Sequence, residues 1–286
     1  MTKNVPDWIR PLQGRFFQNV ILLFSGTAIS QVLLVITVPV LTYVFLPDDF
    51  GRFSIYAAIV AVAAEMVTGK YELSIMLPRY DYQARSLLRL CQGLTLASAA
   101  IAMAVISLWA DTIAALIPSP GIKELLFYIP VSFAAAAFIQ TYTNWNLRKK
   151  QFAIISKARV SQSGITAVAQ LAIGYFAIAS SIGLVLGQII GQIAACLLLL
   201  SFSKGIREGR PRKTLERSLN AGRRYKDFPQ YMLLATTLNG VVVYIPIFAF
   251  SWAYSSAVVG LFAMSQRVIQ LPLSLIGRSI GEAYFQ

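Results

Sequence analysis

The sequence predicts an all-α integral membrane protein with about eight transmembrane helices. Hydrophobic residues make up 57% of the chain and charged residues only 13%, and the mean hydropathy is +0.64. Soluble domains carry about 25% charged residues. The few charges are clustered, which leaves uncharged stretches long enough for the roughly 20 apolar residues of a membrane-spanning helix. Most basic residues also fall on alternate connections between these stretches, as expected for loops on one side of a membrane.

The apolar stretches place the spans in order along the chain. Single spans are expected in residues 16–47, 52–77, 90–110 and 125–147, and two spans each in residues 160–203 and 228–266. Ser180-Ser181-Ile182-Gly183 supplies the turn within the first long stretch, and residues 251–256 supply the turn within the second. Residues 52–77 are unusual because this span contains several charged groups.

The basic residues predict the orientation of these spans. The N-terminus and the connections after the second, fourth and sixth spans carry most of the 25 Lys and Arg residues, whereas the opposite side holds only Arg52 and Lys123. Because Lys and Arg are retained on the cytoplasmic side, we expect a cytoplasmic N-terminus. The net charge of +13 then reflects this bias, and no nucleic-acid partner is needed to explain it.

The chain divides into two parts that resemble each other. We expect a six-helix N-terminal lobe in residues 1–202, a basic cytoplasmic linker in 203–229 and the first two helices of a second lobe in 230–286. Three short matches recur at an offset of about 208 residues: Pro39 with Pro246, Gly51-Arg52-Phe53 with Gly260-Leu261-Phe262, and Gly69-Lys70 with Gly277-Arg278. Both copies would start on the cytoplasmic side, which predicts a parallel repeat about an axis along the membrane normal. A second lobe of equal length needs more helices than residues 230–286 supply. We therefore expect a truncated product or fragment, with oligomerisation as the alternative.

Several kinds of chemistry have no support in the sequence. The chain has no His, and its two cysteines, Cys91 and Cys196, stand alone in apolar stretches, so we expect no metal site, no cofactor and no His-based catalysis. Gly69-Lys70 lacks the upstream glycine and the following Ser or Thr of a phosphate-binding loop. The pair Asp48-Asp49 could hold Mg²⁺, but its place before a helix favours an N-cap. The sequence does not predict an enzyme.

The second span contains three candidate residues of a substrate pathway, Glu65, Lys70 and Glu72. A charge near the middle of a bilayer is costly, so such residues usually face a cavity or a partner. With Arg52 as the outer end, Glu65 lies about 20 Å and Lys70 about 27 Å along the helix. Glu65, Glu72 and Arg79 would share one helical face. Lys70 would point elsewhere and find its counter-charge on another helix or on a ligand, unless it extends to the cytoplasmic headgroups.

Arg267 and Arg278 of the last span are the other candidates. Arg267 is expected about 10 Å below the outer surface. No carboxylate is placed at its depth apart from Asp48 and Asp49 at the rim, so its partner would be one of these, a substrate anion or a group outside this chain. The alternative is an outward-reaching side chain. Arg278 is expected nearer the cytoplasm, where it could pair with Glu282.

Four segments carry a resemblance to a known family: LLFSGTAISQ, PVLTYVFLPDDFGRFSIYAAIV, TGKYELSIMLPR and MSQRVIQLPLSLIGRSIGEAYFQ. They resemble the polysaccharide transporter family, the Wzx-type O-antigen and exopolysaccharide flippases of the multidrug/oligosaccharidyl-lipid/polysaccharide exporter superfamily. The similarity runs from about Asn19 to the last residue. It implies two lobes around a central, often cationic cavity, with twelve or more helices, and this chain departs from that pattern after its eighth.

The resemblance implies that the protein moves a polyprenyl-diphosphate-linked oligosaccharide across the bacterial inner membrane for surface polysaccharide biosynthesis. Membrane lipids are expected partners, and polysaccharide polymerase and chain-length proteins are candidate partners. One alternative is a drug/cation antiporter of the same superfamily, although such a transporter needs more carboxylates than basic groups in its cavity. The other is a membrane glycosyltransferase or polymerase using polyprenyl-phosphate sugars, which would need metal-binding carboxylates.

Overall fold

The computed structural model describes residues 15–117, 119–176, 180–203, 214–267 and 269, and these form helices and connecting turns with no strand. The helices are, in chain order, α1 (Arg15–Leu41), α2 (Pro47–Val67), α3 (Tyr71–Ser74), α4 (Asp81–Leu116), α5 (Ile122–Leu126), α6 (Ile129–Arg148), α7 (Phe152–Phe176), α8 (Ser181–Phe202), α9 (Thr214–Arg224), η2 (Phe228–Met232) and α10 (Leu233–Ala253). A further helix follows over residues 256–267.

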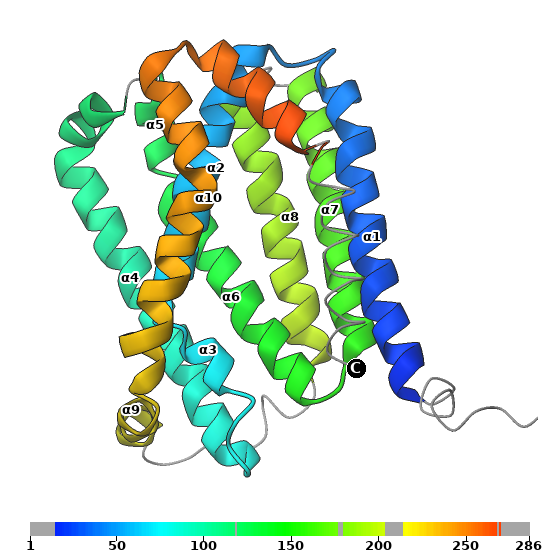
Figure 1. Cartoon of the computed structure of the whole chain (residues 1–286), viewed down its shortest axis with the longest axis vertical. Coiled ribbons are helices and arrows are strands. Elements are labelled where there is room, and N and C mark those ends of the chain that lie inside the picture. Colours follow the sequence, from blue (N-terminus) through cyan, green and yellow to red (C-terminus); the bar gives the residue numbers. More distant parts are fainter. Residues whose placement is uncertain (1–14, 118, 177–179, 204–213, 268, 270–286) are drawn as a thin grey trace, which may run out of the picture.

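The predicted class, an all-α integral membrane protein, is confirmed. Within the described residues, six segments are long and apolar enough to cross a membrane. They correspond to most of α1 (from Leu22), α2, α4, α5 with α6, α8, and η2 with α10. Helix α7 has a sufficient length of 25 residues but is not among these segments, because polar side chains lower its hydropathy. It nevertheless packs between α1 and α8 as part of the bundle (Figure 1). The break predicted at residues 180–183 falls at the start of α8.

The second predicted span is wrong in its extent. The sequence predicted one helix over residues 52–77, but α2 ends at Val67 and a turn at residues 68–70 separates it from the short α3. Gly69 and Lys70 both have positive φ angles, of 58° and 60°, which an α-helix does not allow. Glycine adopts this conformation freely, so Gly69 permits the break.

The helices pack in an order that differs from the chain order. Helices α1, α7 and α8 lie side by side, and α8 packs on α6, which also contacts α4 and α2. Helix α10 contacts the rest of the bundle mainly through α2. At the α7–α8 contact, a β-carbon added to Gly187 would lie 2.7 Å from the backbone nitrogen of Gln170, so this glycine allows close helix approach.

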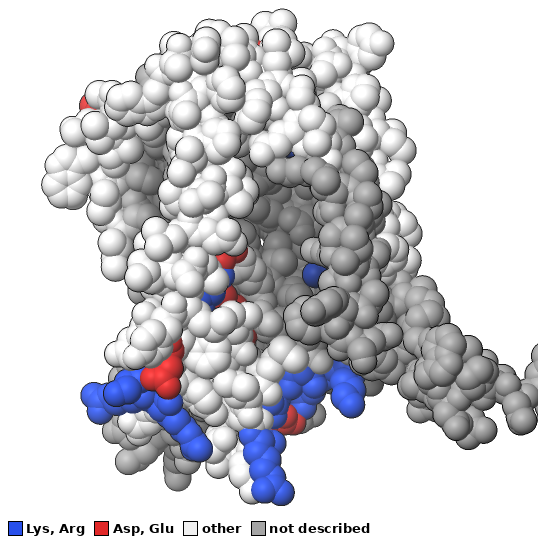
Figure 2. Space-filling view, in the orientation of Figure 1, with Lys and Arg blue, Asp and Glu red and all other residues white. Residues whose placement is uncertain are grey.

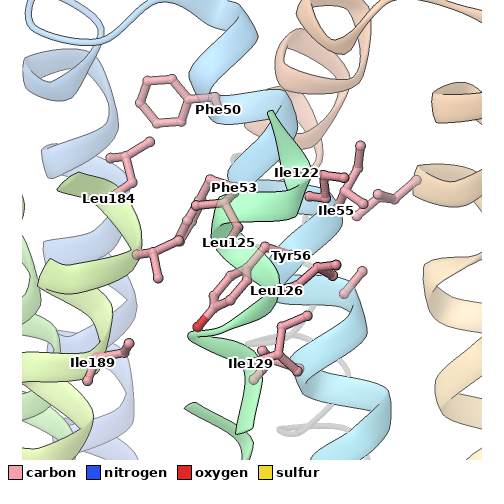
Figure 3. Close-up of a cluster of buried hydrophobic side chains, with 14 of the residues drawn as sticks. Phe50, Phe53, Ile55, Tyr56, Ile122, Leu125, Leu126, Ile129, Leu184 and Ile189 are labelled. Carbon is pink, nitrogen blue, oxygen red and sulfur yellow. The ribbon is translucent and has the colours of Figure 1, made fainter. Parts of the chain in front are cut away.

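Two hydrophobic clusters hold the bundle together. The larger one joins α2, α5, α6 and α8 and includes Tyr56, whose hydroxyl donates to the carbonyl oxygen of Tyr128 at 3.2 Å (Figure 3). The smaller one contains Trp145 and Cys91, both fully buried. Cys91 thus packs as a small apolar side chain, as the sequence predicted. Because lipid tails are as apolar as these residues, close van der Waals packing rather than water exclusion stabilises the contacts within the membrane.

Basic side chains gather at one end of the molecule (Figure 2). This end contains α3, α9 and the start of α4, and we call it the basic end. Helix α9 lies within the predicted basic linker and packs against α4. The Tyr71 hydroxyl donates to the carbonyl oxygen of Gly222 in α9 at 3.2 Å, and burial raises the pKa of Tyr71.

Candidate functional site

A cavity of about 320 Å³ lies among α2, α6, α7 and α8, and we call it the inner cavity. Polar and charged groups make up much of its lining: Glu65, Lys70, Glu72, Gln140, Thr143, Asn144, Arg159 and Gln162. Figure 2 shows acidic and basic side chains together midway along this face of the molecule. Charged groups at such a position are expensive in a membrane and usually serve a pathway.

The charged groups of the inner cavity form a compact ion cluster around Lys70. The Lys70 ammonium donates to the Glu65 carboxylate and lies 3.8 Å from the Glu72 carboxylate. Thr68 donates its hydroxyl hydrogen to Glu72, and Gln140 Nε2 donates to Glu65 at 3.4 Å. The side chains of Lys70 and Glu72 are only 7% and 3% exposed, whereas Glu65 is 32% exposed to the cavity. The single positive charge of Lys70 is therefore shared between two carboxylates of its own segment.

This geometry corrects the sequence prediction for Lys70. A continuous helix would have pointed Lys70 away from Glu65, toward a partner on another helix or a ligand. The left-handed turn at Lys70 instead brings its side chain back to Glu65 and Glu72. The predicted shared face of Glu65, Glu72 and Arg79 is also wrong, because the helix breaks before Glu72 and Arg79 follows Pro78 beyond the end of α3.

Replacing Lys70 with alanine should destabilise the protein by about 3 kcal/mol, because it leaves Glu72 buried and Glu65 partly buried without their cation. For a chain of this size, that corresponds to a fall in Tm of roughly 6–12 °C. Thermal unfolding in detergent measures the effect. The triple variant Glu65→Gln, Lys70→Met, Glu72→Gln removes all three charges and should recover most of the loss. A Lys70→Ala protein with an unchanged Tm would contradict the ion cluster.

A second cavity, of about 400 Å³, lies toward the opposite end of the bundle and is called the outer cavity. Three apolar side chains line it, Leu34, Val35 and Phe53. The other lining residues are polar or charged: Gln31, Gln162, Ser163, Thr166, Gln170, Gln188 and Arg267. Gln162 lines both cavities, so the two are adjacent. The Arg267 guanidinium carbon lies 5.4 Å from the centre of the Phe53 ring, a favourable cation–π arrangement.

No carboxylate among the described residues forms an ion pair with Arg267. The two rim aspartates are engaged elsewhere. Asp48 pairs with Arg52 at 2.5 Å, and Asp49 accepts hydrogen bonds from the backbone nitrogens of Leu46 at 3.3 Å and Ser181 at 2.9 Å. Both aspartates lie in the first turn of α2 rather than at the predicted N-cap, because the helix begins at Pro47 and its N-cap is Leu46.

Helix α7 supplies residues that the sequence analysis missed. Arg159, Gln162, Ser163, Thr166 and Gln170 line the two cavities. The predicted spans 125–147 and 160–203 put Arg159 in the basic connection between them, but α7 starts at residue 152, which places Arg159 two turns into the helix. Its Nη1 donates to Thr27 Oγ1 of α1 at 2.5 Å. The spacing i, i+3, i+4, i+7, i+11 of these five residues is that of one helical face and could have revealed them. Arg278, the remaining predicted site residue, lies outside the described residues.

A close helix crossing lies beside the rim aspartates, between α2 and the helix of residues 256–267. A β-carbon added to Gly51 would lie 1.8 Å from the carbonyl oxygen of Ser256, and one added to Gly260 would lie 2.0 Å from the carbonyl oxygen of Pro47. Gly51 and Gly260 are 209 residues apart, and so are Pro47 and Ser256, which is close to the offset of the predicted repeat. The repeat therefore relates one of these two contacts to the other. This glycine crossing supports the proposed relation between the two parts of the chain.

The chain with this polar, partly cationic interior resembles one known protein family. A family of polysaccharide biosynthesis proteins matches residues 40–285, which is most of the chain. No curated protein and no solved structure matches the chain. The match confirms the family resemblance that the sequence predicted. The chain therefore belongs to this family of polysaccharide biosynthesis proteins, with a role in polysaccharide synthesis or export.

Proposed function

We propose that the protein is a flippase-type transporter that moves a polyprenyl-diphosphate-linked oligosaccharide across the bacterial inner membrane. The observation that carries this proposal is the pair of adjacent cavities that share Gln162, with Arg159 lining one and Arg267 lining the other. Their polar lining lies inside helices whose outer surfaces are apolar. Such an interior suits a polar cargo and has no purpose in a purely structural bundle.

The cavity chemistry matches the two polar parts of this substrate. Sugar hydroxyls both donate and accept hydrogen bonds, and the amide and hydroxyl side chains of α7 that line the outer cavity can do the same: Gln162, Ser163, Thr166 and Gln170. A diphosphate carries charge that cannot enter hydrocarbon bare, so it needs cations that replace part of its hydration. Arg267 is such a cation, because no described carboxylate pairs with it. Lys70 is less suited to this role, since two carboxylates already neutralise it.

The basic end is proposed to face the cytoplasm, together with the N-terminus. Reporter fusions at Lys150 and Arg212 should then read cytoplasmic, and fusions at Pro120 and Ser255 should read periplasmic. The physical reason is the retention of Lys and Arg on the cytoplasmic side during insertion. A periplasmic reading at Arg212 would contradict both the orientation and the proposed division into six helices followed by two.

Deletion of the gene tests the proposed function. Completed lipid-linked oligosaccharide should accumulate, and it should be accessible to membrane-impermeant reagents only from the cytoplasmic face. A membrane glycosyltransferase would instead leave shortened oligosaccharides, and its purified form would show Mg²⁺-dependent sugar transfer. A drug/cation antiporter would leave lipid-linked sugars unchanged and raise sensitivity to cationic drugs. Either of these results would replace the flippase proposal.

A further inference from the structure

Another cavity, of about 570 Å³, lies at the basic end, between the connection from α3 to α4 and the turn from α6 to α7. It shares no lining residue with the inner or outer cavity. Four basic side chains and one carboxylate line it together with apolar groups: Met76, Pro78, Arg79, Asp81, Leu147, Arg148, Lys149, Lys150 and Phe152. We call it the basic pocket. Its charges leave a clear excess of positive charge in one small volume.

Two of the four cations build the frame of the basic pocket. Arg148, only 12% exposed, donates from Nη2 to Asp81 Oδ1 at 3.1 Å and from Nη1 to the carbonyl oxygens of Ile75 at 3.3 Å and Met76 at 3.2 Å. Lys149 donates to the other oxygen of Asp81. One carboxylate is thus shared by two cations, and it cannot neutralise any further positive charge.

The other two cations, Arg79 and Lys150, are exposed and have no carboxylate partner among the described residues. Lys150 has a φ of 54°, in the left-handed region that favours glycine after the end of a helix. Its backbone nitrogen donates to the carbonyl oxygen of Leu147 at 2.9 Å, which closes the turn after α6. A cation near a helix C-terminus is favourable for the helix dipole. That effect does not account for Arg79, which belongs to a different segment.

We propose that the basic pocket binds the phosphodiester headgroup of an anionic phospholipid through Arg79 and Lys150. Guanidinium and ammonium groups are the usual donors to phosphate oxygens, and basic pockets beside transmembrane helices bind anionic headgroups. The pocket lies beside the ends of α4 and α6, where their apolar segments give way to charged residues, which is the level of lipid headgroups. Met76, Leu147 and Phe152 provide an apolar wall for the acyl chains that extend from the headgroup.

A lipid titration of the whole chain tests this proposal. The protein is held in nanodiscs of zwitterionic phosphatidylcholine, and binding of added phosphatidylglycerol is measured by native mass spectrometry. The double variant Arg79→Gln, Lys150→Gln should bind this lipid about thirtyfold more weakly, because it removes two direct contacts to the phosphate, each of which contributes at least about fivefold. The control Arg223→Gln, Arg224→Gln removes the same charge from exposed positions of α9 at the same end. It should weaken binding by less than about threefold, because Arg223 and Arg224 do not line the basic pocket and their exposed charges act on the lipid only through screened attraction.

If the two double variants lose the same affinity for phosphatidylglycerol, the lipid is held by general surface attraction only, and the proposed site is overturned. Unchanged affinity in the Arg79→Gln, Lys150→Gln variant would overturn it as well. Inorganic phosphate provides the other arm: saturable binding of phosphate without any preference for the lipid would also overturn it. Lys150→Gly separates binding from folding, because glycine relieves the left-handed conformation. This variant should keep or raise Tm and bind the lipid about fivefold more weakly. Unchanged lipid binding by a folded Lys150→Gly protein would contradict the proposal.

Discussion

Arg267→Ala should reduce polysaccharide export by roughly tenfold or more, because a hydrogen bond to a charged group typically contributes about 1.5–3 kcal/mol. The Arg267 guanidinium lines the outer cavity over the ring of Phe53, and no described carboxylate pairs with it. Its removal therefore leaves no described anion buried without a partner, and the protein should still fold and insert. Arg267 differs in this respect from Lys70, because removal of the Lys70 side chain lowers the stability of the fold itself. Surface polysaccharide per unit of membrane-inserted protein is the measurement.

Two variants serve as controls for Arg267. Arg267→Lys keeps the charge but loses the planar guanidinium, so it should retain more export than Arg267→Ala if charge dominates. Lys123→Ala removes a cation that is half exposed, pairs with Asp111 and lies outside both cavities. Exposed ion pairs contribute about 0–1 kcal/mol, so its export should stay normal. Normal export by Arg267→Ala at wild-type protein levels would remove Arg267 from the proposed pathway.

Gly51→Ala and Gly260→Ala should each destabilise the protein by about 3 kcal/mol. The added β-carbon would overlap with backbone atoms on the facing helix, at 1.8 Å for Gly51 and 2.0 Å for Gly260. Backbone cannot move aside as a flexible side chain can, so the two helices must separate, and we expect the upper end of the roughly 1–3 kcal/mol that overpacking typically costs. We expect a lower Tm in detergent and a lower yield of inserted protein for both variants.

The same substitution at other helical glycines provides the matched control. A β-carbon at Gly93 in α4 or Gly164 in α7 would have no neighbour within 4 Å. Because alanine favours a helix over glycine by about 0.5–1 kcal/mol, Gly93→Ala and Gly164→Ala should leave stability unchanged or raise it. The sign of the effect thus depends on the crossing and not on the residue type. Equal Tm values for Gly51→Ala and Gly164→Ala would show that the glycine crossing is not tightly packed.

The sequence by itself determined the class of the protein and most of its helices. A bilayer leaves no water to satisfy backbone groups, so an apolar stretch of about 20 residues has to form a helix wherever it lies in the chain. Hydropathy therefore located the apolar helices, and the Ser180–Gly183 break located the start of α8. The sequence also predicted that most Lys and Arg residues lie on one side of the membrane, and in the structure basic side chains gather at one end of the molecule. The motifs identified the family, and the match over residues 40–285 confirms it.

Only the tertiary structure decided which polar groups meet. The position of the Lys70 side chain depends on the turn formed by Gly69 and Lys70, both of which have positive φ. Hydropathy cannot detect such a turn inside an apolar segment. The ion cluster of Lys70 with Glu65 and Glu72 follows from this turn. Arg159 looked like a loop residue until packing between α1 and α8 placed α7 in the bundle and directed its polar face inward. The periodicity of a helix shows that polar residues share a face. Which neighbour that face meets depends on the packing of distant segments, and local sequence does not contain that information.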